Sequence, residues 1–307
     1  MMSETSFNWS LITIAKAVQG KLVGDDRLVQ GVTTDTRSAV SGELFIALQG
    51  PNFDGHDYVE QAEQKGVAAL LVSRQVSTSL PQIIVTDTRI ALGKLANAWR
   101  MQFSIPLIAI TGSNGKTTVK EITTSILAQQ HEVLATKGNL NNDIGVPLTL
   151  LRLAPEHSAA VIEMGANHPQ EIEYLTDIAK PTVAVITNAG PAHLEGFGDL
   201  DGVAKAKGEV YSSLTEDGTA VINKDDKYYQ YWRSLCKDMN VSSFGLSQDA
   251  DFSVVKNDKQ IVISTPDGSV SVDYQLPGEH NLSNALAATA ACSAAGVELD
   301  DVKNGLE

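Results

Sequence analysis

The pattern of hydrophobic and polar residues changes twice along the chain, and the first stretch ends near residue 103. Within it, short apolar runs are typical of buried strands, and longer amphipathic runs predict helices. The predicted strands lie at 42–48, 68–73 and 82–87. The predicted helices lie at 56–66, which Gly66 closes, and at 90–103. Pro106 then marks a break, so we expect a first domain over residues 1–103.

The second stretch alternates regularly between apolar strands and amphipathic helices. The predicted strands lie at 107–111, 132–136, 159–165, 182–188 and 219–223. The predicted helices lie at 116–130, 169–179, 202–214 and 227–237. Strands that are apolar on both faces and alternate with helices indicate a parallel sheet covered on both sides.

From about residue 250 the pattern changes to short strands separated by turn residues, which predicts an antiparallel meander. A final helix is expected at 281–296. The predicted fold class is therefore α/β. We expect a small N-terminal α/β domain, followed over residues 104–307 by a mostly parallel-sheet domain that resembles P-loop nucleotide-binding domains and carries a short antiparallel extension.

Composition and charge narrow the functional classes. The chain has 307 residues, of which 43% are hydrophobic, so two domains with sizeable cores are expected. Its net charge of −14 and the absence of a dense basic run argue against nucleic-acid binding. No apolar run reaches the roughly 18 residues typical of a membrane span. Cys236 and Cys292 stand apart from each other, which is typical of buried thiols in a reducing compartment, and we expect a cytoplasmic protein.

The segment "ITGSNGKTT" at 110–118 is the strongest candidate for chemistry. The usual phosphate-binding loop has a Gly, four residues and then Gly-Lys-Ser/Thr, but Ile110 stands where that first Gly should be. A predicted strand precedes the segment and a predicted helix follows it, which is the context that phosphate binding requires. Lys116 can reach the outer phosphates, and the Thr117 hydroxyl can take a Mg²⁺ position. The candidate phosphate-binding residues are Gly112, Ser113, Asn114, Gly115, Lys116, Thr117 and Thr118.

Several polar residues follow predicted strands or begin the last helix, and each has an alternative interpretation. Glu163 ends a strand at the sheet edge where ligands bind, so it is a candidate Mg²⁺ ligand. His193 follows the next strand, but a lone histidine is more often structural. Asn281 and Asn284 can bind adenine through their amides, although Asn281 is equally explained as a helix N-cap. Asn142 is also typical of a turn.

A set of segments beyond the loop resembles the Mur ligases, ATP-dependent amide-forming enzymes of cell-wall synthesis. In that family a shorter loop, T-G-x-N-G-K-[TGS]-[TS], replaces the usual one. The matching segments are "KGNLNNDIGVPLTLL" (137–151), "VIEMGANHPQEI" (161–172), "ITNAGPAHLEGFG" (186–198), "VAKAKGEVYSSL" (203–214) and "PGEHNLSNALAA" (277–288). The N-terminal segment at 33–59 resembles the uridine-nucleotide domain of two family members.

The resemblance implies a specific reaction. The segments at 163–172 and 188–198 are most similar to the family member that joins D-alanyl-D-alanine to UDP-N-acetylmuramoyl-tripeptide, with ATP and two Mg²⁺ ions. It implies that His193 binds the second Mg²⁺, that Asn281 and Asn284 lie near adenine, and that Asn142 lies near the substrate and the γ-phosphate. The residues matching the uridine-diphosphate site are Thr34, Thr36, Arg37, Asn52 and Phe53.

The resemblance also singles out one of two lysines in the segment at 203–214. Lys205 and Lys207 are two residues apart, so on a helix at most one of them points toward the site. On the residues alone, both are typical of solvated helix lysines. Lys207 matches the position at which relatives carry a lysine carbamylated by CO₂, which implies that it is carbamylated and binds the second Mg²⁺.

One departure from the family bears on activity. Relatives carry a third, C-terminal domain after the adenine-contacting helix, and we expect this domain to be absent from the chain. We expect the chain to be a monomer.

Three alternative functions stay open: a folylpolyglutamate-type amide ligase, a P-loop kinase or NTPase, and a nucleotide-binding fragment without full activity. The expected absence of the C-terminal domain keeps the third one open. The uridine-nucleotide segment disfavours the first, and Ile110 disfavours the second.

Overall fold

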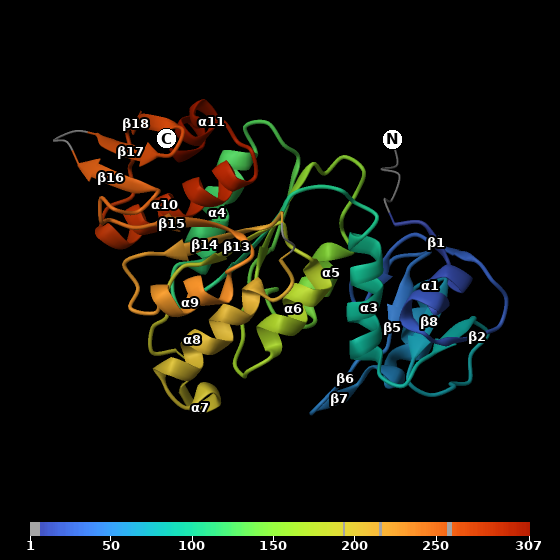
Figure 1. Cartoon of the computed structure of the whole chain (residues 1–307). Coiled ribbons are helices and arrows are strands. Elements are labelled where there is room, and N and C mark those ends of the chain that lie inside the picture. The colour runs from blue at the N-terminus through green and yellow to red at the C-terminus, as the bar shows by residue number, and fades with distance from the viewer. Residues whose placement is uncertain (1–6, 193, 215–216, 257–259) are drawn as a thin grey trace. The chain divides into compact units, whose positions relative to one another are not determined.

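The structure, a computed structural model, describes residues 7–192, 194–214, 217–256 and 260–307 (Figure 1). The chain divides into two compact units. The first comprises Met1–Phe103 and Asp143–Pro155, and the second comprises Ser104–Asn142 and Glu156–Glu307. The first unit thus ends its continuous part at Phe103, and a short later segment returns to it.

The first unit contains a sheet that, in its described residues, has five strands in the order β2-β9-β8-β5-β4. The strands are β2 (Lys21–Val23), β4 (Val32–Thr33), β5 (Leu44–Ile46), β8 (Ala69–Val72) and β9 (Gln82–Ile84). All neighbours are parallel except β2 and β9. Strands β5 and β8 are fully buried, as their unbroken apolar runs predict.

Helices and small strands complete the first unit. They are β1 (Trp9–Ser10), α1 (Leu11–Val18), β3 (Leu28–Val29), β6 (Gln49–Gly50), β7 (Phe53–Asp54), η1 (Gly55–Tyr58), α2 (Val59–Gln64), α3 (Thr88–Arg100) and α5 (Gly145–Leu150). Helix α3 begins where the Asp87 carboxylate accepts hydrogen bonds from the N–H groups of Arg89 and Ile90. Strands β6 and β7 form a hairpin, which presents Phe53.

The second unit is built on a parallel sheet, as the alternating pattern predicts. Its described residues include six strands in the order β11-β12-β10-β13-β14-β15. The strands are β10 (Leu107–Thr111), β11 (Val133–Ala135), β12 (Ala159–Glu163), β13 (Val183–Ile186), β14 (Thr219–Asn223) and β15 (Asn240–Phe244). The chain moves to one side of β10 for two strands and then to the other side for three. Strand order therefore reverses between β10 and β13, where open α/β sheets bind their ligands.

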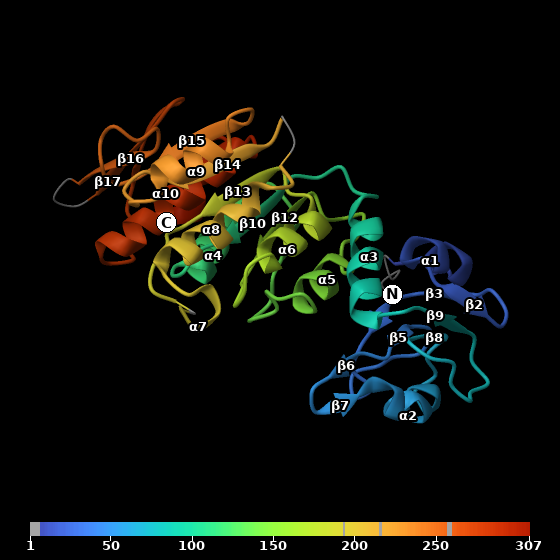
Figure 2. The same ribbon diagram turned by 60° about the horizontal axis from the view of Figure 1, so that its bottom comes forward.

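Helices cover the two faces of this sheet (Figure 2). Alternate residues of β10, such as Ile108 and Ile110, share a core with α4 (Lys116–Leu127) and α10 (Glu279–Ala294). The helices of the second unit outside this core follow the remaining strands. They are α6 (Glu171–Ala179), α7 (Leu194–Phe197), α8 (Leu200–Gly208), η2 (Glu209–Tyr211) and α9 (Tyr229–Leu235).

The C-terminal part adds the antiparallel meander that the sequence predicts. It consists of β16 (Ser253–Lys256), β17 (Ile261–Thr265) and β18 (Gly268–Val272), followed after α10 by α11 (Leu299–Leu306). Val254, Ile263 and Val270 pack into the same core as α4 and α10. This extension therefore covers the helices that border the phosphate loop.

Among the elements that were not predicted, two have identifiable reasons. Strand β15 reads "NVSSF", in which two serines interrupt the apolar run, yet it pairs in register with β14. Helix α5 reads "GVPLTL", and its Gly and Pro suggest a turn. Pro147 is tolerated because it lies in the first turn, where the backbone N–H has no helical partner.

Candidate functional site

The phosphate loop, Gly112 to Gly115, connects β10 to the first turn of α4, as predicted. Gly112 and Gly115 have φ angles of +149° and +82°, the conformation that only glycine adopts readily. A side chain would not fit at either position. A Cβ at Gly112 would stand 1.9 Å from Thr187 Oγ1, and a Cβ at Gly115 would stand 2.5 Å from Asn284 Oδ1. The loop is thus closely packed, and its N–H groups lie at the positive end of α4.

Residues after the neighbouring strand β13 hold this loop in place. Ser113 N–H donates to Asn188 O at 3.1 Å, and Ser113 Oγ exchanges hydrogen bonds with the backbone of Gly190. Asn114 N–H donates to Asn188 Oδ1 at 3.0 Å, while Asn188 Nδ2 and Thr187 Oγ1 donate to Asn114 O. The loop after β13 therefore fixes the backbone of the phosphate loop by side-chain and main-chain contacts.

Lys116 folds back over the loop that precedes it. Its Nζ donates to Gly112 O at 2.8 Å and lies 3.5 Å from Ser113 O. Burial lowers the pKa of the Lys116 ammonium, and the negative charge of Glu163 partly opposes that shift. This position places a cation over the loop where phosphate oxygens would be neutralised.

Glu163 lies at the end of β12, and its carboxylate is almost fully buried, with the residue 2% exposed. Thr117 Oγ1 donates to its Oε2 at 2.9 Å, and Asn141 Nδ2 donates to its Oε1 at 2.8 Å. A buried carboxylate is costly unless it is paired, so hydrogen bonds from Thr117 and Asn141 stabilise it. The structure thus brings together the two residues that the sequence assigned to Mg²⁺, Thr117 and Glu163, at the edge of the sheet.

The two lysines of α8 have different environments, as their spacing predicts. Lys205 is exposed, whereas Lys207 is 2% exposed and its Nζ lies 5.8 Å from the centre of the Phe197 ring. Burial, and secondly the charge of Lys116, lower the pKa of Lys207 to about 8, against the opposing effect of Glu209 and Glu171. A substantial neutral fraction near pH 8 makes the Lys207 amine a nucleophile.

The N-terminal part of α10 lies against the phosphate loop. Asn284 is 8% exposed. Its amide contacts Gly115, because a Cβ added at Gly115 would lie 2.5 Å from Asn284 Oδ1. Gly278 is the N-cap residue of α10, so the N-cap interpretation of Asn281 is wrong. Asn281 lies within the first turn and its Nδ2 donates to Pro277 O at 2.8 Å. Both amides therefore lie on the helix that borders the loop.

A pocket of about 560 Å³ lies in the first unit. It is lined by Thr34, Asp35, Thr36, Arg37, Phe45, Phe53, Gly55, Tyr58 and Gln61. Four of the five residues expected at the uridine-diphosphate site line it. Asn52 is exposed and is not among the lining residues described.

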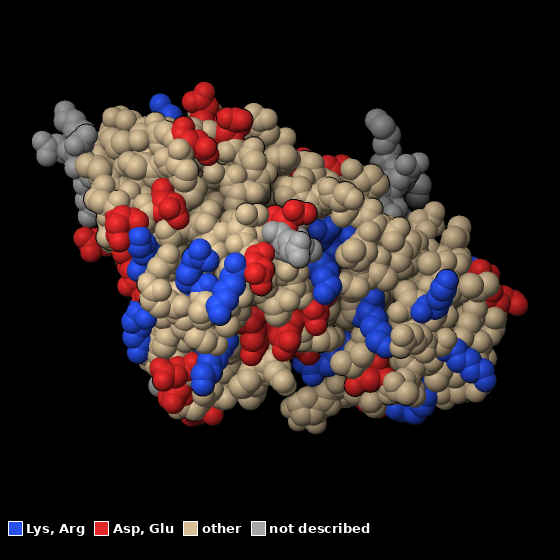
Figure 3. All heavy atoms as spheres, viewed as in Figure 1, with Lys and Arg blue, Asp and Glu red and all other residues tan. Residues whose placement is uncertain are grey.

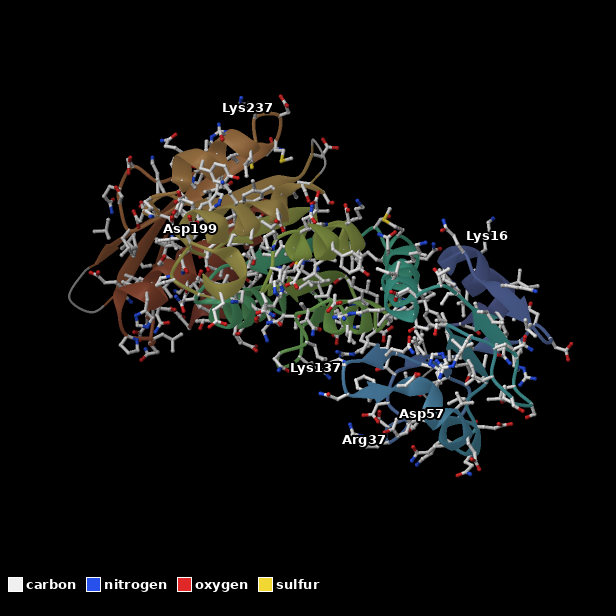
Figure 4. All side chains as sticks on the ribbon, turned by 90° about the horizontal axis from the view of Figure 1, so that it is seen from below. Lys16, Arg37, Asp57, Lys137, Asp199 and Lys237 are labelled. Carbon is white, nitrogen blue, oxygen red and sulfur yellow. The ribbon has the colours of Figure 1, made fainter. Side chains whose placement is uncertain are left out.

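The side chains of this pocket are already engaged with one another. Arg37 Nε donates to Asp35 Oδ1 at 2.9 Å, and a second guanidinium nitrogen donates to Asp35 Oδ2 at 2.6 Å. Hydrogen bonds from the Arg37 side chain and backbone lower the pKa of the Asp35 carboxyl to about 2. Thr36 Oγ1 donates to Gln61 Oε1 at 2.6 Å. Arg37, labelled in Figure 4, is nevertheless 87% exposed at its side chain, so an anion can reach it.

Two residues expected near the phosphates are not placed there by described contacts. His193 lies outside the described residues. Asn142 is exposed, and it is the neighbouring Asn141 that contacts Glu163. The sequence "LNNDIG" offers two adjacent asparagines, and only the backbone geometry decides between them. Asn141 N–H donates to Asn139 O within this loop at 2.8 Å, and Asn141 O accepts from Gly165 N–H, after β12, at 2.8 Å.

The distribution of charged residues and of possible metal ligands limits the kind of cation site that the described residues can form. On the face shown in Figure 3, Lys and Arg are interspersed with Asp and Glu. Among the described residues, no group of three or more His, Cys, Asp or Glu could hold a metal ion. A cation at Glu163 would therefore need ligands of other kinds, such as the Thr117 hydroxyl or phosphate oxygens.

Within the part of the chain that the structure describes, no helix is both long and apolar enough to cross a membrane.

Comparison with known proteins places this geometry in a family. A model described as "Mur ligase middle domain" matches residues 110–292, and "Mur ligase family, catalytic domain" matches residues 28–100. The chain is 47% identical to the UDP-N-acetylmuramoyl-tripeptide–D-alanyl-D-alanine ligase of Escherichia coli (strain K12), over 97% of this chain and 67% of that protein.

Solved structures agree with the sequence comparisons. A crystal structure of MurF from Acinetobacter baumannii matches 99% of this chain and 68% of its own, with a TM-score of 0.94 and 39% identity. MurF ligase from Thermotoga maritima, in complex with ADP, matches 89% of this chain and 65% of its own, with a TM-score of 0.79 and 29% identity. The predicted fold class and the resemblance are both confirmed, and the chain belongs to the Mur ligase family.

Proposed function

We propose that this chain is an ATP-dependent ligase that adds D-alanyl-D-alanine to UDP-N-acetylmuramoyl-tripeptide in peptidoglycan synthesis. The relatives at 46–47% identity carry that activity in their names. The observation that carries the proposal is the assembly at the end of the parallel sheet, where Lys116 covers the shortened loop and Thr117 bonds Glu163 at 2.9 Å. A separate pocket in the first unit offers a place for the uridine nucleotide.

ATP fits the second unit. The backbone N–H groups at the beginning of α4 and the side chains of the loop would hold its phosphates, and α10 would hold its adenine. The proposed phosphate-binding residues are Gly112, Ser113, Asn114, Gly115, Lys116, Thr117 and Thr118. Asn281 and Asn284 are proposed at adenine, because their helix borders the loop and amides match its donor and acceptor groups. A MurF relative has been solved in complex with ADP, which supports this assignment.

Two Mg²⁺ ions are proposed, with ligands from different elements. Thr117 and Glu163 would hold the first, and His193 and Lys207 would hold the second. When bound, Mg²⁺ would supply positive charge that offsets the charge of the phosphates and polarises the transferred group. The donors fit, because a buried carboxylate beside a hydroxyl offers the oxygen ligands that Mg²⁺ prefers.

Lys207 is proposed to reach its ligand form by carbamylation. The neutral amine attacks CO₂ through its lone pair, a C–N bond forms, and one proton leaves to solvent, which gives an anionic carbamate. The lowered pKa of Lys207, about 8, supplies the neutral amine that this step requires. The new anion would also replace a buried cation near Lys116, which removes a repulsion between like charges.

In the proposed reaction, the γ-phosphoryl group of ATP passes to the terminal carboxylate of the tripeptide, and ADP leaves. The amine of D-alanyl-D-alanine then attacks the acyl phosphate, an amide bond forms, and phosphate leaves. The protein contributes positioning and charge neutralisation. Lys116 offsets the charge on the phosphates. Asn142 is proposed to orient the reacting groups, and Asn141 positions Glu163.

The pocket of the first unit is proposed to bind the uridine diphosphate. Arg37 would bind phosphate oxygens, and Phe53 would offer an apolar face for the uracil ring. Thr34 and Thr36 line the same pocket, and Asn52 is proposed on the adjoining loop. We propose that one copy of the chain acts as a monomer, because both candidate sites are built from residues of a single chain.

Product analysis tests this function. The chain is incubated with ATP and Mg²⁺, with each substrate alone and with both, and ADP and the ligated peptide are measured. We expect ADP to form only when UDP-tripeptide and D-alanyl-D-alanine are both present. ADP release that does not depend on either substrate would indicate a simple NTPase, and glutamate-dependent release with a folate would indicate the folylpolyglutamate-type reaction.

A further inference from the structure

The loop that supports the phosphate loop is itself held by residues that follow β14. Asn223 Nδ2 donates to Thr187 O at 2.8 Å. The carboxylate of Asp226 accepts from Ala189 N–H at 2.8 Å through one oxygen. Its other oxygen accepts from Tyr228 N–H at 2.9 Å. Asp226 thus connects the segment 187–190 to the beginning of α9.

Helix α9, whose beginning Asp226 contacts, is itself packed tightly against the rest of the second unit. Trp232 is completely buried, and its Nε1 donates to Ala204 O on α8 at 2.9 Å. Helix α8 carries Lys207, and it packs closely on α9, because a Cβ at Gly208 would stand 2.7 Å from Leu235 Cδ1. The segment around Asp226 therefore joins the loop after β13 to the helix of Lys207.

We propose that Asp226 is a positioning residue for the nucleotide, which acts through the segment 187–190 on the phosphate loop. This inference rests on the proposed binding of ATP to that loop. Ala189 precedes Gly190, whose backbone bonds Ser113 Oγ in both directions. Asn188, on the other side of Ala189, bonds the backbone of Ser113 and Asn114.

The energetic argument concerns preorganisation. A phosphate-binding loop gains affinity for its ligand when its backbone is already ordered before binding. Removal of the Asp226 carboxylate leaves Ala189 N–H and Tyr228 N–H without the acceptor that fixes them. The segment 187–190 then has more conformational freedom, and nucleotide binding must reorder it. The substitution should therefore lower nucleotide affinity, because Asp226 acts on the segment 187–190, which holds the backbone of the phosphate loop.

The adjacent Asp225 provides a matched control. It is also a loop carboxylate that accepts a backbone N–H, from Leu246 at 2.6 Å, and it lies against Gly245. Its contacts thus lead to the segment after β15, whereas those of Asp226 lead to the segment after β13. The two substitutions remove the same chemical group one residue apart.

Equilibrium binding of ATP and of UDP-tripeptide to Asp226→Ala, Asp225→Ala and Asp226→Asn tests the proposal. We expect Asp226→Ala to weaken ATP binding by about tenfold, as for one lost hydrogen bond to a charged group. UDP-tripeptide binding should be unchanged, and Asp225→Ala should bind ATP like the unmodified chain. Asp226→Asn, which keeps one carbonyl acceptor, should recover part of the affinity and remains informative if Asp226→Ala does not fold.

Two results would overturn the inference: unchanged ATP affinity in both Asp226 variants, or equal losses in Asp225→Ala and Asp226→Ala. ATP binding to Lys116→Ala distinguishes failure of the Asp226 inference from failure of the proposed function. If Lys116→Ala loses ATP binding while the Asp226 variants do not, only the positioning role is wrong. If Lys116→Ala binds ATP normally, the phosphate loop is not the nucleotide site, and both proposals are wrong.

Discussion

The two candidate sites are built in different ways. Around the phosphate loop, Glu163, Lys207 and Asn284 are buried, and two glycines leave no room for a side chain. In the first unit, the pocket is open and its main cation, Arg37, is largely exposed and paired with Asp35. The first arrangement suits a ligand that must be held in one geometry for chemistry. The second suits a ligand that must be recognised and anchored.

This difference predicts different consequences of substitution. In the second unit, a single changed group disturbs several others, because Glu163, Thr117 and Asn141 form one hydrogen-bonded set. In the first unit, the pairs Arg37–Asp35 and Thr36–Gln61 are separate from each other, so the loss of one contact should cost about the value of that contact. Substitutions in the two regions should therefore affect different measured quantities.

The largest effect is expected at Lys116. Lys116→Ala should reduce turnover by at least about 10²–10³-fold, because it removes positive charge at the transferred group. Binding of UDP-tripeptide should stay nearly unchanged. Steady-state kinetics and a binding titration measure the two quantities. Lys237→Ala, at an exposed lysine of the same unit (Figure 4), is the control and should be fully active. Equal losses of turnover and UDP-tripeptide binding in Lys116→Ala would contradict the separation of the sites.

Lys207→Ala should be nearly inactive, while Lys205→Ala, on the exposed side of α8, should retain activity. Short carboxylic acids should restore part of the activity of Lys207→Ala, because they can occupy the vacated anion site. Full activity of Lys207→Ala without additives would show that the lysine has no role as a ligand.

Carbamylation of Lys207 should also depend on pH with a defined sign. The reactive form is the neutral amine, and the pKa of Lys207 is lowered to about 8. At a fixed CO₂ concentration, the rate should fall about tenfold for each pH unit below 8, as the amine becomes protonated. Labelling with ¹³CO₂ and NMR measure this rate. A rate that already falls between about pH 10 and pH 8, as for an exposed lysine, would contradict the burial argument.

Gly115→Ala tests the close packing of the phosphate loop. The new methyl group would meet Asn284 Oδ1, and alanine at φ +82° is strained, so we expect a loss of about 1–3 kcal/mol in the free energy of unfolding. ATP affinity should fall as well. Gly138→Ala is the control, since Gly138 has φ +57° but open space around its Cβ position. Similar ATP affinity in both variants would mean that only backbone strain matters at Gly115.

The smallest effect is expected in the first unit. Arg37→Ala should weaken UDP-tripeptide binding by about 10–100-fold, the value of a charge-assisted hydrogen bond, and leave ATP binding unchanged. Arg74→Ala, at an arginine of the same unit that is paired with Asp54, is the control. A loss of ATP affinity in Arg37→Ala would contradict the separation of the ATP and UDP-tripeptide sites. Unchanged UDP-tripeptide affinity would exclude Arg37 from the diphosphate site.

The sequence predicts the parts of the fold and site that depend on local patterns. The strand, loop and helix around Lys116 are contiguous, and Glu163 ends an apolar strand, so their places could be expected. The choice of Lys207 over Lys205 followed from helix geometry and resemblance together. These features are encoded within a few neighbouring residues.

Contacts between distant segments could not be predicted in this way. Asn188 and Asp226 support the phosphate loop from the ends of β13 and β14, and nothing in their local sequence indicates it. Asn141 and Asn142 are chemically identical neighbours, so only the backbone decides which amide contacts Glu163. The return of Asp143–Pro155 to the first unit likewise depends on tertiary packing.

The most direct test of two separate sites is a competition titration. ATP with Mg²⁺ is titrated into the chain in the absence of UDP-tripeptide and again at its saturating concentration, and the dissociation constant is measured each time by calorimetry. The account predicts that ATP still binds to the chain saturated with UDP-tripeptide, with one ATP per chain. Displacement of UDP-tripeptide by ATP, with an apparent dissociation constant that rises in proportion to UDP-tripeptide concentration, would show that the two ligands share one site and would contradict the account.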